Sequence, residues 1–333
     1  MGGGSFLLAA LFLREVSNMA LGINDIETAR QRIEPYAFNT PLLRLENLDD
    51  RLGCRVFAKA ECMQKTGSFK LRGAMNRILS LPRGQIEKGI VAVSSGNHGR
   101  AVAYAAKLFG LQATIIIPDT AARVKVEAIR ELGANIIQCK AEDRFPLAEQ
   151  ICNERGLTMV PPYDDYEIMA GQGTCGLEIM EQCPDMDAVL VPVSGGGLLS
   201  GVSCAIKAVS PNTRVFGICP EVLPHFKLSF DKGEPVAVPQ RTSIADALAS
   251  RQPGKKTFPV IKQFCDGIFA VSEEKIIAGM KLMLTEGKVL AEASSCICAG
   301  ALLMGKVPVR ENDRVCLLLS GGNVGLEQLE MLK

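Results

Sequence analysis

The sequence has no excess of charge of either sign, because 37 lysines and arginines face 36 aspartates and glutamates. Nucleic acids and anionic membranes attract proteins through a basic excess, so this balance excludes both as the main partner and favours a small molecule. Low-complexity runs, heptads and repeats of solenoid period are also absent. The chain has 333 residues, of which 47% are hydrophobic, and this is enough for two domains or one large one.

Patterns typical of metal or redox sites are missing as well. The only two histidines, His98 and His225, are far apart in the sequence and suggest no metal site together. The twelve cysteines form no C-x-x-C pair, and Cys296 and Cys298 form only a C-x-C. Scattered cysteines of this kind are usually buried thiols in a reducing compartment, which predicts a cytoplasmic protein.

The N-terminus carries an apolar run from Ser5 to Leu13, which has the length of a signal peptide. No positive residue precedes this run, and it is far shorter than the ~20 residues that span a bilayer. We therefore expect residues 1–18 to form an N-terminal extension ahead of the fold, with Met19 as an alternative start. A cleaved signal peptide is the less favoured alternative.

Short apolar runs alternate with helical patterns from residue 89 onward. Three of the helical segments end at a glycine, a residue favoured just after a helix. Strands that are buried on both faces and joined through helices predict parallel sheets with right-handed crossovers. The predicted strands are 89–95, 113–118, 135–139, 188–193, 214–221 and 313–323, and the helix-closing glycines are Gly110, Gly133 and Gly156.

Three glycine- and serine-rich turns, at residues 94–99, 194–198 and 320–323, follow predicted strands. Parallel sheets bind ligands at the carboxyl ends of their strands, so these turns indicate a ligand crevice. The glycines of 194–198 would expose backbone N–H groups at a helix start, which suits a phosphate. A tight turn that binds no ligand is the alternative for this segment.

A dinucleotide site of the Rossmann type competes with a simple phosphate site at residues 194–198. Glu221 ends the next predicted strand, about 20 residues on, where an acidic residue would bind a ribose. However, the third glycine position of G-x-G-x-x-G, counted from Gly195, holds Ser200, and no G-K-[ST] follows. An NAD-linked dehydrogenase therefore remains only a secondary interpretation.

The segment KTGSFKLRG, residues 65–73, holds three cations ahead of a predicted helix. Lys65 and Arg72 can reach solvent, and we expect both at the surface. Lys70 stands where the helix should begin, so the helix dipole and burial in a cleft would both lower its pKa. A neutral amine is the nucleophile for Schiff-base formation with an aldehyde, although an ordinary surface lysine fits the same pattern.

Two of the turns carry polar side chains suited to a ligand. Residues 94–98 offer hydroxyl, amide and backbone donors beside a helix start, which suits a carboxylate or a phenolic oxygen, or simply caps the helix. His98, alone in this turn, is typical of a hydrogen-bonded structural group. Ser320 ends a buried strand and would lie at the floor of the crevice.

The motifs KTGSFKLRGA, SSGNH, PPYDD…AGQGT, SGGGL and LSGGN, in this order and spacing, resemble those of fold-type II pyridoxal-phosphate enzymes. Within that class the chain is similar to the serine/threonine dehydratase (threonine ammonia-lyase) and serine racemase family, over roughly residues 23–325. The resemblance implies an α/β protein of two domains, each a mostly parallel twisted sheet flanked by helices, as in the tryptophan synthase β-like fold. The implied large pyridoxal-phosphate-binding domain is 19–60 plus 161–333, the small domain is 61–160, and the assembly is a homodimer.

The resemblance also implies a role for each matching residue. Lys70 would form the internal aldimine with pyridoxal 5'-phosphate and then act as the general base, and Ser95 would lie on the opposite face of the cofactor. A hydroxyl at the pyridine nitrogen, rather than an aspartate, would suit β-elimination or a controlled proton transfer. The implied cofactor contacts are Phe69, Lys70, Asn97, Gly195, Gly196, Gly197, Leu198 and Ser320, and the implied substrate contacts are Ser94, Ser95, Gly96, Asn97 and His98.

The implied activity is that of an ammonia-lyase of amino-acid catabolism, which converts L-threonine, L-serine or both to a 2-oxo acid and ammonia. A serine racemase that uses Lys70 and Ser95 is one alternative, because serine racemases carry a serine at this position, as some serine dehydratases do. A dehydratase of a specialised hydroxy-amino acid is another, because Asp246 and Arg251 lie in a segment that borders the substrate in similar enzymes.

Similar enzymes bind a cation at positions that match Glu221, His225 and Lys227 of this chain. A lysine ammonium in that site would repel a cation, so these residues look unfit and we expect no metal there. Our hypothesis is that Lys227 points inward and pairs with Glu221 in place of the ion.

Overall fold

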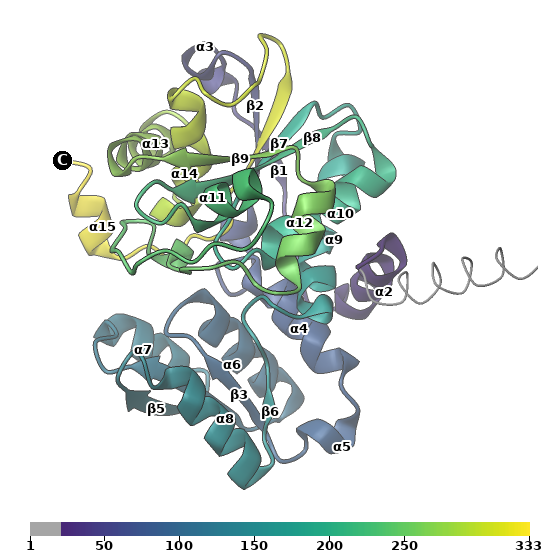
Figure 1. The fold of residues 1–333 in the computed structure, drawn as a ribbon, viewed down its shortest axis with the longest axis vertical. Helices are drawn as coiled ribbons and strands as arrows, with labels where there is room; N and C mark the ends of the chain where they lie inside the picture. The colour runs from purple at the N-terminus through teal and green to yellow at the C-terminus, as the bar shows by residue number, and fades with distance from the viewer. Residues whose placement is uncertain (1–20) are drawn as a thin grey trace, which may run out of the picture.

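The computed structural model describes residues 21–333, so the expected extension at residues 1–18 lies outside the described residues. Two sheets organise the described part of the chain. One has six strands in the order β1-β2-β10-β7-β8-β9, and the other has four in the order β5-β4-β3-β6. Only the β1–β2 pair is antiparallel among the described strand pairs. Figure 1 shows the two sheets in separate bodies, each with helices packed around it, as the predicted fold class requires.

The six-stranded sheet comprises β1 (Leu42–Arg44), β2 (Arg55–Lys59), β7 (Ala188–Pro192), β8 (Arg214–Pro220), β9 (Gly267–Val271) and β10 (Arg314–Leu318). The four-stranded sheet comprises β3 (Ile90–Val93), β4 (Ala113–Pro118), β5 (Asn135–Cys139) and β6 (Thr158–Met159). All six predicted strands are present. The sequence analysis does not predict β1, β2, β6 and β9. Of these, β1 and β6 have only three and two residues and β9 is a partly exposed edge strand.

The longer helices join and cover the strands. They are α2 (Ile23–Ile33), α4 (Lys70–Ser80), α6 (Asn97–Phe109), α7 (Arg123–Arg130), α8 (Arg144–Arg155), α9 (Tyr166–Gln182), α10 (Gly197–Val209), α11 (His225–Lys232), α12 (Thr257–Phe264), α13 (Glu273–Thr285) and α14 (Ala293–Leu303). The shorter ones are α3 (Asp49–Leu52), α5 (Arg83–Ile86), α15 (Leu326–Glu330) and the 3-10 turns η1 (Glu46–Leu48), η2 (Glu61–Met63) and η3 (Asp246–Leu248). None of the helices within residues 21–333 combines the length and apolar character needed to cross a membrane.

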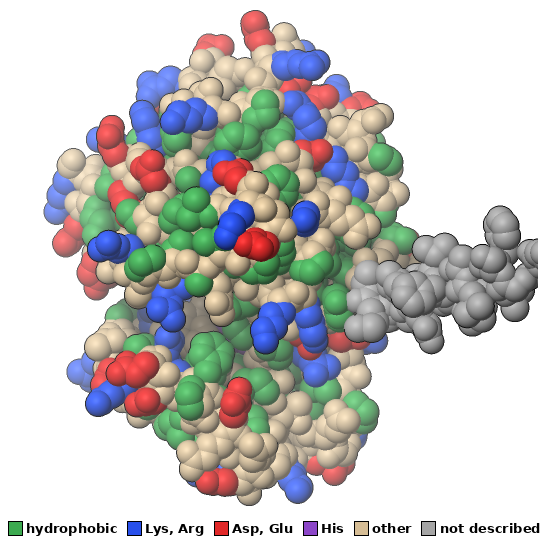
Figure 2. All heavy atoms as spheres, viewed as in Figure 1, with side chains coloured by type: hydrophobic (Ala, Val, Ile, Leu, Met, Phe, Trp, Pro, Cys, Tyr) green, Lys and Arg blue, Asp and Glu red, His purple; other side chains and the backbone are tan. Residues whose placement is uncertain are grey.

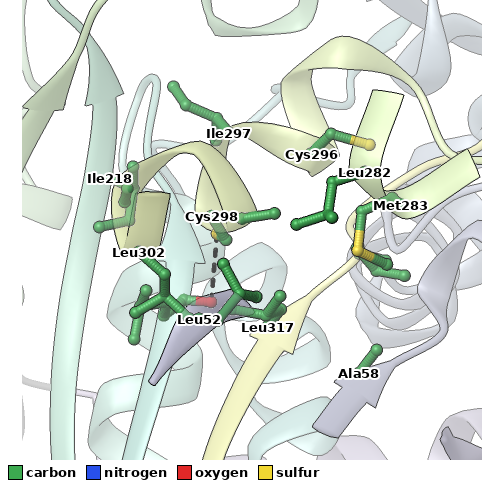
Figure 3. Packing of buried hydrophobic residues seen from close by; sticks show 14 of the residues in the cluster. Leu52, Ala58, Ile218, Leu282, Met283, Cys296, Ile297, Cys298, Leu302 and Leu317 are labelled. Carbon is green, nitrogen blue, oxygen red and sulfur yellow. Dashed lines mark hydrogen bonds between the residues drawn. The ribbon is translucent and has the colours of Figure 1, made fainter. Parts of the chain in front are cut away.

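The core of the six-stranded sheet includes several of the cysteines. Helix α14 buries Cys296 and Cys298 completely, and the Cys298 thiol donates a hydrogen bond to the carbonyl of Leu190 in β7, at 3.4 Å. Figure 3 shows this bond as the dashed line from Cys298. All twelve cysteines lie in the described residues, and none forms a disulfide. Burial raises the pKa of Cys219 to about 12, so this thiol behaves as a small apolar group, as the sequence predicts.

Helices α4 and α9 approach closely through glycines. A Cβ atom on Gly171 would lie 2.6 Å from the carbonyl oxygen of Arg72 and 2.7 Å from Cα of Gly73. Such distances are too short for any side chain, so glycine is required for the two helices to meet. This contact fixes α4, the helix that begins at Lys70.

A buried ionic cluster lies between α4, α9 and β2, and it corrects the expectation for Arg72. Arg72 is 1% exposed, not at the surface. Its guanidinium donates to Glu61 at 2.8 Å and to Glu178 at 2.6 Å, while Lys59 donates to Glu178 at 2.6 Å. Two cations and two carboxylates thus pair directly with one another, which is how buried charges are retained in proteins.

Candidate active site

The three glycine- and serine-rich turns line a single cavity of about 980 Å³. They follow β3, β7 and β10 at the carboxyl ends of these strands, as the sequence predicts. Figure 2 shows the molecule narrowing between its two bodies, with several Lys and Arg side chains along this waist. The cavity is lined by all twelve residues to which the sequence analysis gives a cofactor or substrate role: Phe69, Lys70, Ser94, Ser95, Gly96, Asn97, His98, Gly195, Gly196, Gly197, Leu198 and Ser320.

Lys70 is the first residue of α4, as predicted, and its side chain reaches the cavity. Its amine donates a hydrogen bond to the carbonyl of Pro162 at 2.6 Å and lies 5.1 Å from the centre of the Phe69 ring. Burial disfavours the ammonium form and lowers the pKa of Lys70 to about 8. A substantial neutral fraction therefore exists near physiological pH, and neutral amine is the form that attacks an aldehyde.

Labelling of Lys70 by an amine-selective reagent is expected to reach half its maximal rate near pH 8, because only the neutral amine reacts. The same residue in the denatured chain should titrate near the ordinary lysine value of 10.5. At pH 7 the neutral fraction would be roughly one in ten for a pKa of about 8, against roughly one in three thousand for 10.5. Peptide mass spectrometry of labelled samples across pH 6–11 measures both curves. Superimposable folded and denatured curves would contradict the shift.

The glycine turn between β7 and α10 is a backbone cradle. Gly196 has φ +100°, a conformation that favours glycine, and a Cβ atom on Gly195 would lie 2.3 Å from the ring of Tyr163. Helix α10 begins at Gly197, so its first N–H groups and the positive end of its dipole face the cavity. This arrangement suits a phosphate group.

Asn97 lies in the middle of a chain of hydrogen bonds. Arg100 donates to Asn323 at 2.7 Å, Asn323 donates to Asn97 at 2.7 Å, and Asn97 donates to Glu292 at 2.8 Å. The chain fixes the orientation of the Asn97 amide and leaves its second amide hydrogen for a ligand. Burial, reinforced by repulsion from Asp246, raises the pKa of Glu292 to about 7, while the bond from Asn97 opposes the shift.

Ser320 and His98 are held by buried partners. The Ser320 hydroxyl lies 3.0 Å from the Ser295 hydroxyl, which in turn donates to the carbonyl of Gly321 at 2.7 Å. The His98 ring lies 2.9 Å from the carbonyl of Val160, and burial lowers its pKa to about 3. His98 is therefore a neutral, hydrogen-bonded ring, and its implied contact with the substrate stays a prediction.

Several cavity residues are missing from the sequence analysis. Glu292 precedes α14, and Tyr163 lies in the PPYDD motif, which carries the resemblance but was given no role. Lys125 of α7 forms an ion pair with Asp246 of η3, and so joins the helices of the four-stranded sheet to the opposite wall. A single charged or aromatic residue gives no pattern in a sequence, so only the fold identifies these side chains as neighbours. Asp246 and Arg251 both line the cavity, where their segment was expected to border the substrate.

The hypothesis that Lys227 pairs with Glu221 is wrong. Lys227 forms an ion pair with Asp231, one turn further along α11, and Glu221 is exposed. One helical turn brings residues i and i+4 together on a surface, so Lys227 finds a nearer partner than Glu221. His225 is buried, with its ring 2.8 Å from the carbonyl of Ser194. Residues 21–333 contain no group of three or more His, Cys, Asp or Glu placed to hold a metal ion.

Comparisons with known proteins agree with this geometry. Residues 33–321 match the family described as "Pyridoxal-phosphate dependent enzyme". The chain is 38% identical to L-threo-3-hydroxyaspartate ammonia-lyase of Saccharomyces cerevisiae, with 92% of this chain and 95% of the relative covered. It is 37% identical to L-threonine ammonia-lyase of Thermotoga maritima, with 93% and 77% covered. It is also 37% identical to serine racemase of Dictyostelium discoideum, with 93% and 97% covered.

Solved structures give the same result. The structure of maize serine racemase superposes with a TM-score of 0.90 at 37% identity and covers 93% of this chain and 96% of its own. The crystal structure of a T.th. threonine deaminase superposes with a TM-score of 0.87 at 38% identity and covers 91% and 99%. The fold is therefore shared with both kinds of protein.

Proposed function

Because this chain belongs to the family of pyridoxal-phosphate-dependent enzymes, we propose that it is an ammonia-lyase acting on L-threonine, L-serine or both. Its products would be a 2-oxo acid and ammonia. The observation that supports this most strongly is the partly buried amine of Lys70, with its pKa lowered to about 8, in a cavity that also contains the glycine cradle. Relatives at 37–38% identity include an L-threonine ammonia-lyase and an L-threo-3-hydroxyaspartate ammonia-lyase.

The residues of the cavity fit the cofactor of the family. The backbone N–H groups of Gly195–Leu198 would hold its phosphate, Asn97 its phenolic oxygen and Ser320 its ring nitrogen, with Phe69 beside the ring. Gly196 adopts a backbone conformation that favours glycine, and a side chain on Gly195 would meet Tyr163, so this turn keeps the open backbone that a phosphate requires. When bound, pyridoxal phosphate supplies an aldehyde for the substrate amine and an electron sink for the bond broken at Cα.

The side chains of the protein would bind the substrate and move its proton. Residues Ser94–His98 lie at the start of α6, where hydroxyls and backbone N–H groups can bind the substrate carboxylate and orient its Cα–H bond. The Lys70 amine, neutral in a large fraction of molecules near pH 8, would accept that proton. The cavity wall partly desolvates this amine, which is why its pKa is lowered.

Product analysis tests the proposal directly. Purified protein, supplied with pyridoxal phosphate, is incubated separately with L-threonine, L-serine and L-threo-3-hydroxyaspartate. Quantifying the 2-oxo acid, the ammonia and the D-amino acid measures elimination and racemisation together. We expect equimolar 2-oxo acid and ammonia from threonine or serine, and absence of both from all three substrates would refute the lyase assignment.

Ser95 favours amino-acid racemisation as a second candidate activity, because it supplies a hydroxyl within the same cavity as Lys70. Racemisation needs one group to remove the Cα proton and another to return it from the other face. The serine racemase of Dictyostelium discoideum, 37% identical, is consistent with this possibility.

Replacing Ser95 with alanine is expected to reduce racemisation by at least about 100-fold, because no second proton donor would remain. Elimination should fall no further than it does in Ser94→Ala, since it uses only the lysine for proton transfer and both serines lie in the turn proposed to bind the carboxylate. Initial rates of D-serine and pyruvate formation from L-serine give both numbers. Ser94→Ala is the matched control, because a weakened carboxylate contact should slow both reactions alike. Equal losses of the two activities in Ser95→Ala would count against the second role.

The substrate class has a further candidate, a hydroxy-amino acid with a second carboxylate. Lys125 at the cavity mouth offers a cation, although Asp246 pairs with it. A substrate carboxylate of the kind named for the yeast relative would compete with Asp246 for that ammonium. Of the three substrates in the product assay, L-threo-3-hydroxyaspartate tests this hypothesis.

We also propose a cytoplasmic homodimer, and light scattering should give twice the chain mass.

A further inference from the structure

The segment Pro161–Asp165 crosses from the four-stranded sheet to α9, and two of its residues, Pro162 and Tyr163, line the cavity. It begins after β6 and ends at the first residue before α9. The carbonyl of Pro162 accepts the hydrogen bond from the Lys70 amine, while the ring of Tyr163 packs on Gly195. Asp164 follows these two residues, and its carboxylate contacts residues 255–257 instead.

The Asp164 carboxylate binds three successive backbone N–H groups. Its Oδ2 accepts from Lys255 at 3.0 Å, and its Oδ1 accepts from Lys256 at 2.7 Å and from Thr257 at 3.2 Å. These groups form the start of α12, which has no cap from its own side chains. Asp164 therefore caps α12 from about 90 positions earlier in the sequence, where its charge also meets the positive end of the helix dipole.

The capped segment in turn holds the glycine turn. The Thr257 hydroxyl donates to the carbonyl of Gly195 at 2.7 Å, and the backbone N–H of Gly254 donates to the same carbonyl at 3.3 Å. A Cβ atom on Gly254 would lie 2.4 Å from Asp164, so the fit between the segment and the carboxylate is close. The position of the Gly195 peptide thus depends on residues 254–257, and their position depends on Asp164.

We propose that Asp164 is a positioning residue for the phosphate-binding turn, and through that turn for the phosphate of the cofactor. This inference rests on the proposed role of Gly195–Leu198. Asp164 does not touch the turn itself. It fixes α12 and Thr257, which anchor the outer side of the turn and leave its inner N–H groups free for an anion.

The adjacent Asp165 provides a matched control. Its carboxylate caps α9 by accepting from the N–H groups of Glu167 and Ile168, at 2.9 and 3.1 Å. The two aspartates are neighbours in sequence and both cap a helix, but only Asp164 contacts the segment that anchors the glycine turn. A general loss of stability should therefore follow from either replacement, whereas a change in phosphate binding should follow only from replacement of Asp164.

The test compares two aldehydes on the cofactor-free protein. Pyridoxal phosphate and pyridoxal, which lacks the phosphate, are titrated against wild type, Asp164→Ala, Asp164→Asn and Asp165→Ala, with the visible absorbance band as the signal. We expect Asp164→Ala to weaken binding of pyridoxal phosphate about 10-fold and to leave that of pyridoxal within about twofold. Asp164→Asn should recover most of the loss, because its remaining oxygen can still accept from Lys256 and Thr257. Asp164→Asn also keeps the test possible if Asp164→Ala does not fold.

Three results would overturn the inference. These are an equal loss for both aldehydes in Asp164→Ala, an unchanged affinity for pyridoxal phosphate in both Asp164 variants, and an equally large selective loss in Asp165→Ala. A wild-type protein that binds pyridoxal phosphate no more tightly than pyridoxal would instead refute the proposed role of the glycine turn, and the present inference with it.

Discussion

Replacing Lys70 with alanine is expected to abolish the visible absorbance band of the bound cofactor and to reduce turnover by at least about 10⁴-fold. The amine lies on the wall of the cavity that also holds the glycine turn and Asn97, and burial lowers its pKa to about 8. Its removal deletes the covalent attachment point and the proposed acceptor of the substrate proton together. Absorbance spectroscopy, and the mass of the protein after borohydride reduction, measure the attachment independently of activity.

Lys65→Ala is the control for the Lys70 experiment. Lys65 belongs to the same segment, but it is exposed and its ammonium lies 4.9 Å from the centre of the Phe38 ring. The band and the turnover of this variant should stay within about twofold of wild type, because a surface cation–π contact contributes little to binding or catalysis. A reduced adduct located on any lysine other than Lys70 would refute the assignment.

Replacing Arg72 with methionine is expected to lower the free energy of unfolding by about 3–5 kcal/mol. The guanidinium is fully buried and is bonded to both Glu61 and Glu178, so its loss leaves two carboxylates without their main partner. Burial by itself would raise the pKa of Glu61, but Arg72 and nearby donors hold it below the usual value. Chemical denaturation followed by circular dichroism measures the loss.

Arg77→Met is the matched control on the same helix. The Arg77 side chain is 24% exposed and lies 3.4 Å from the Asp165 carboxylate, so its replacement should cost less than about 1 kcal/mol. The pH dependence of the free energy of unfolding gives a second test of the ionic cluster. The pKa of Glu61 is lower in the folded protein than in the unfolded chain. Its ionised form therefore adds to the free energy of unfolding above pH 4.5, the ordinary pKa, and this addition is lost as the pH falls through the folded pKa. Equal stability of the two variants at pH 7 would show that the cluster contributes nothing beyond packing.

The sequence predicted those features that are encoded locally. Apolar runs bounded by glycines predicted six of the ten strands, and the start of α4 at Lys70 followed from the pattern of residues 65–73. The meeting of the three turns followed from the rule that ligands bind at the carboxyl ends of parallel strands. The domain boundaries and the individual roles of the cavity residues stay predictions.

Features that depend on distant partners were not predictable from the sequence. Arg72 was expected at the surface because the sequence does not reveal that its face of α4 meets α9, whose Glu178 lies more than a hundred positions away. The Lys227 hypothesis failed for the opposite reason, since its partner Asp231 lies only one turn along the same helix and this local pair was overlooked. Asp164 caps a helix that starts 93 positions later, and no local pattern signals such a contact.

Strand β2 lies between β1 and β10, so a strand near the start of the described chain pairs with one near its end. During synthesis on the ribosome, the contiguous four-stranded sheet can assemble while the chain is still growing, whereas β2 waits for β10 to emerge. The nascent protein would therefore hold Lys70 beside an unfinished wall, and cofactor binding would wait until β10 has been synthesised.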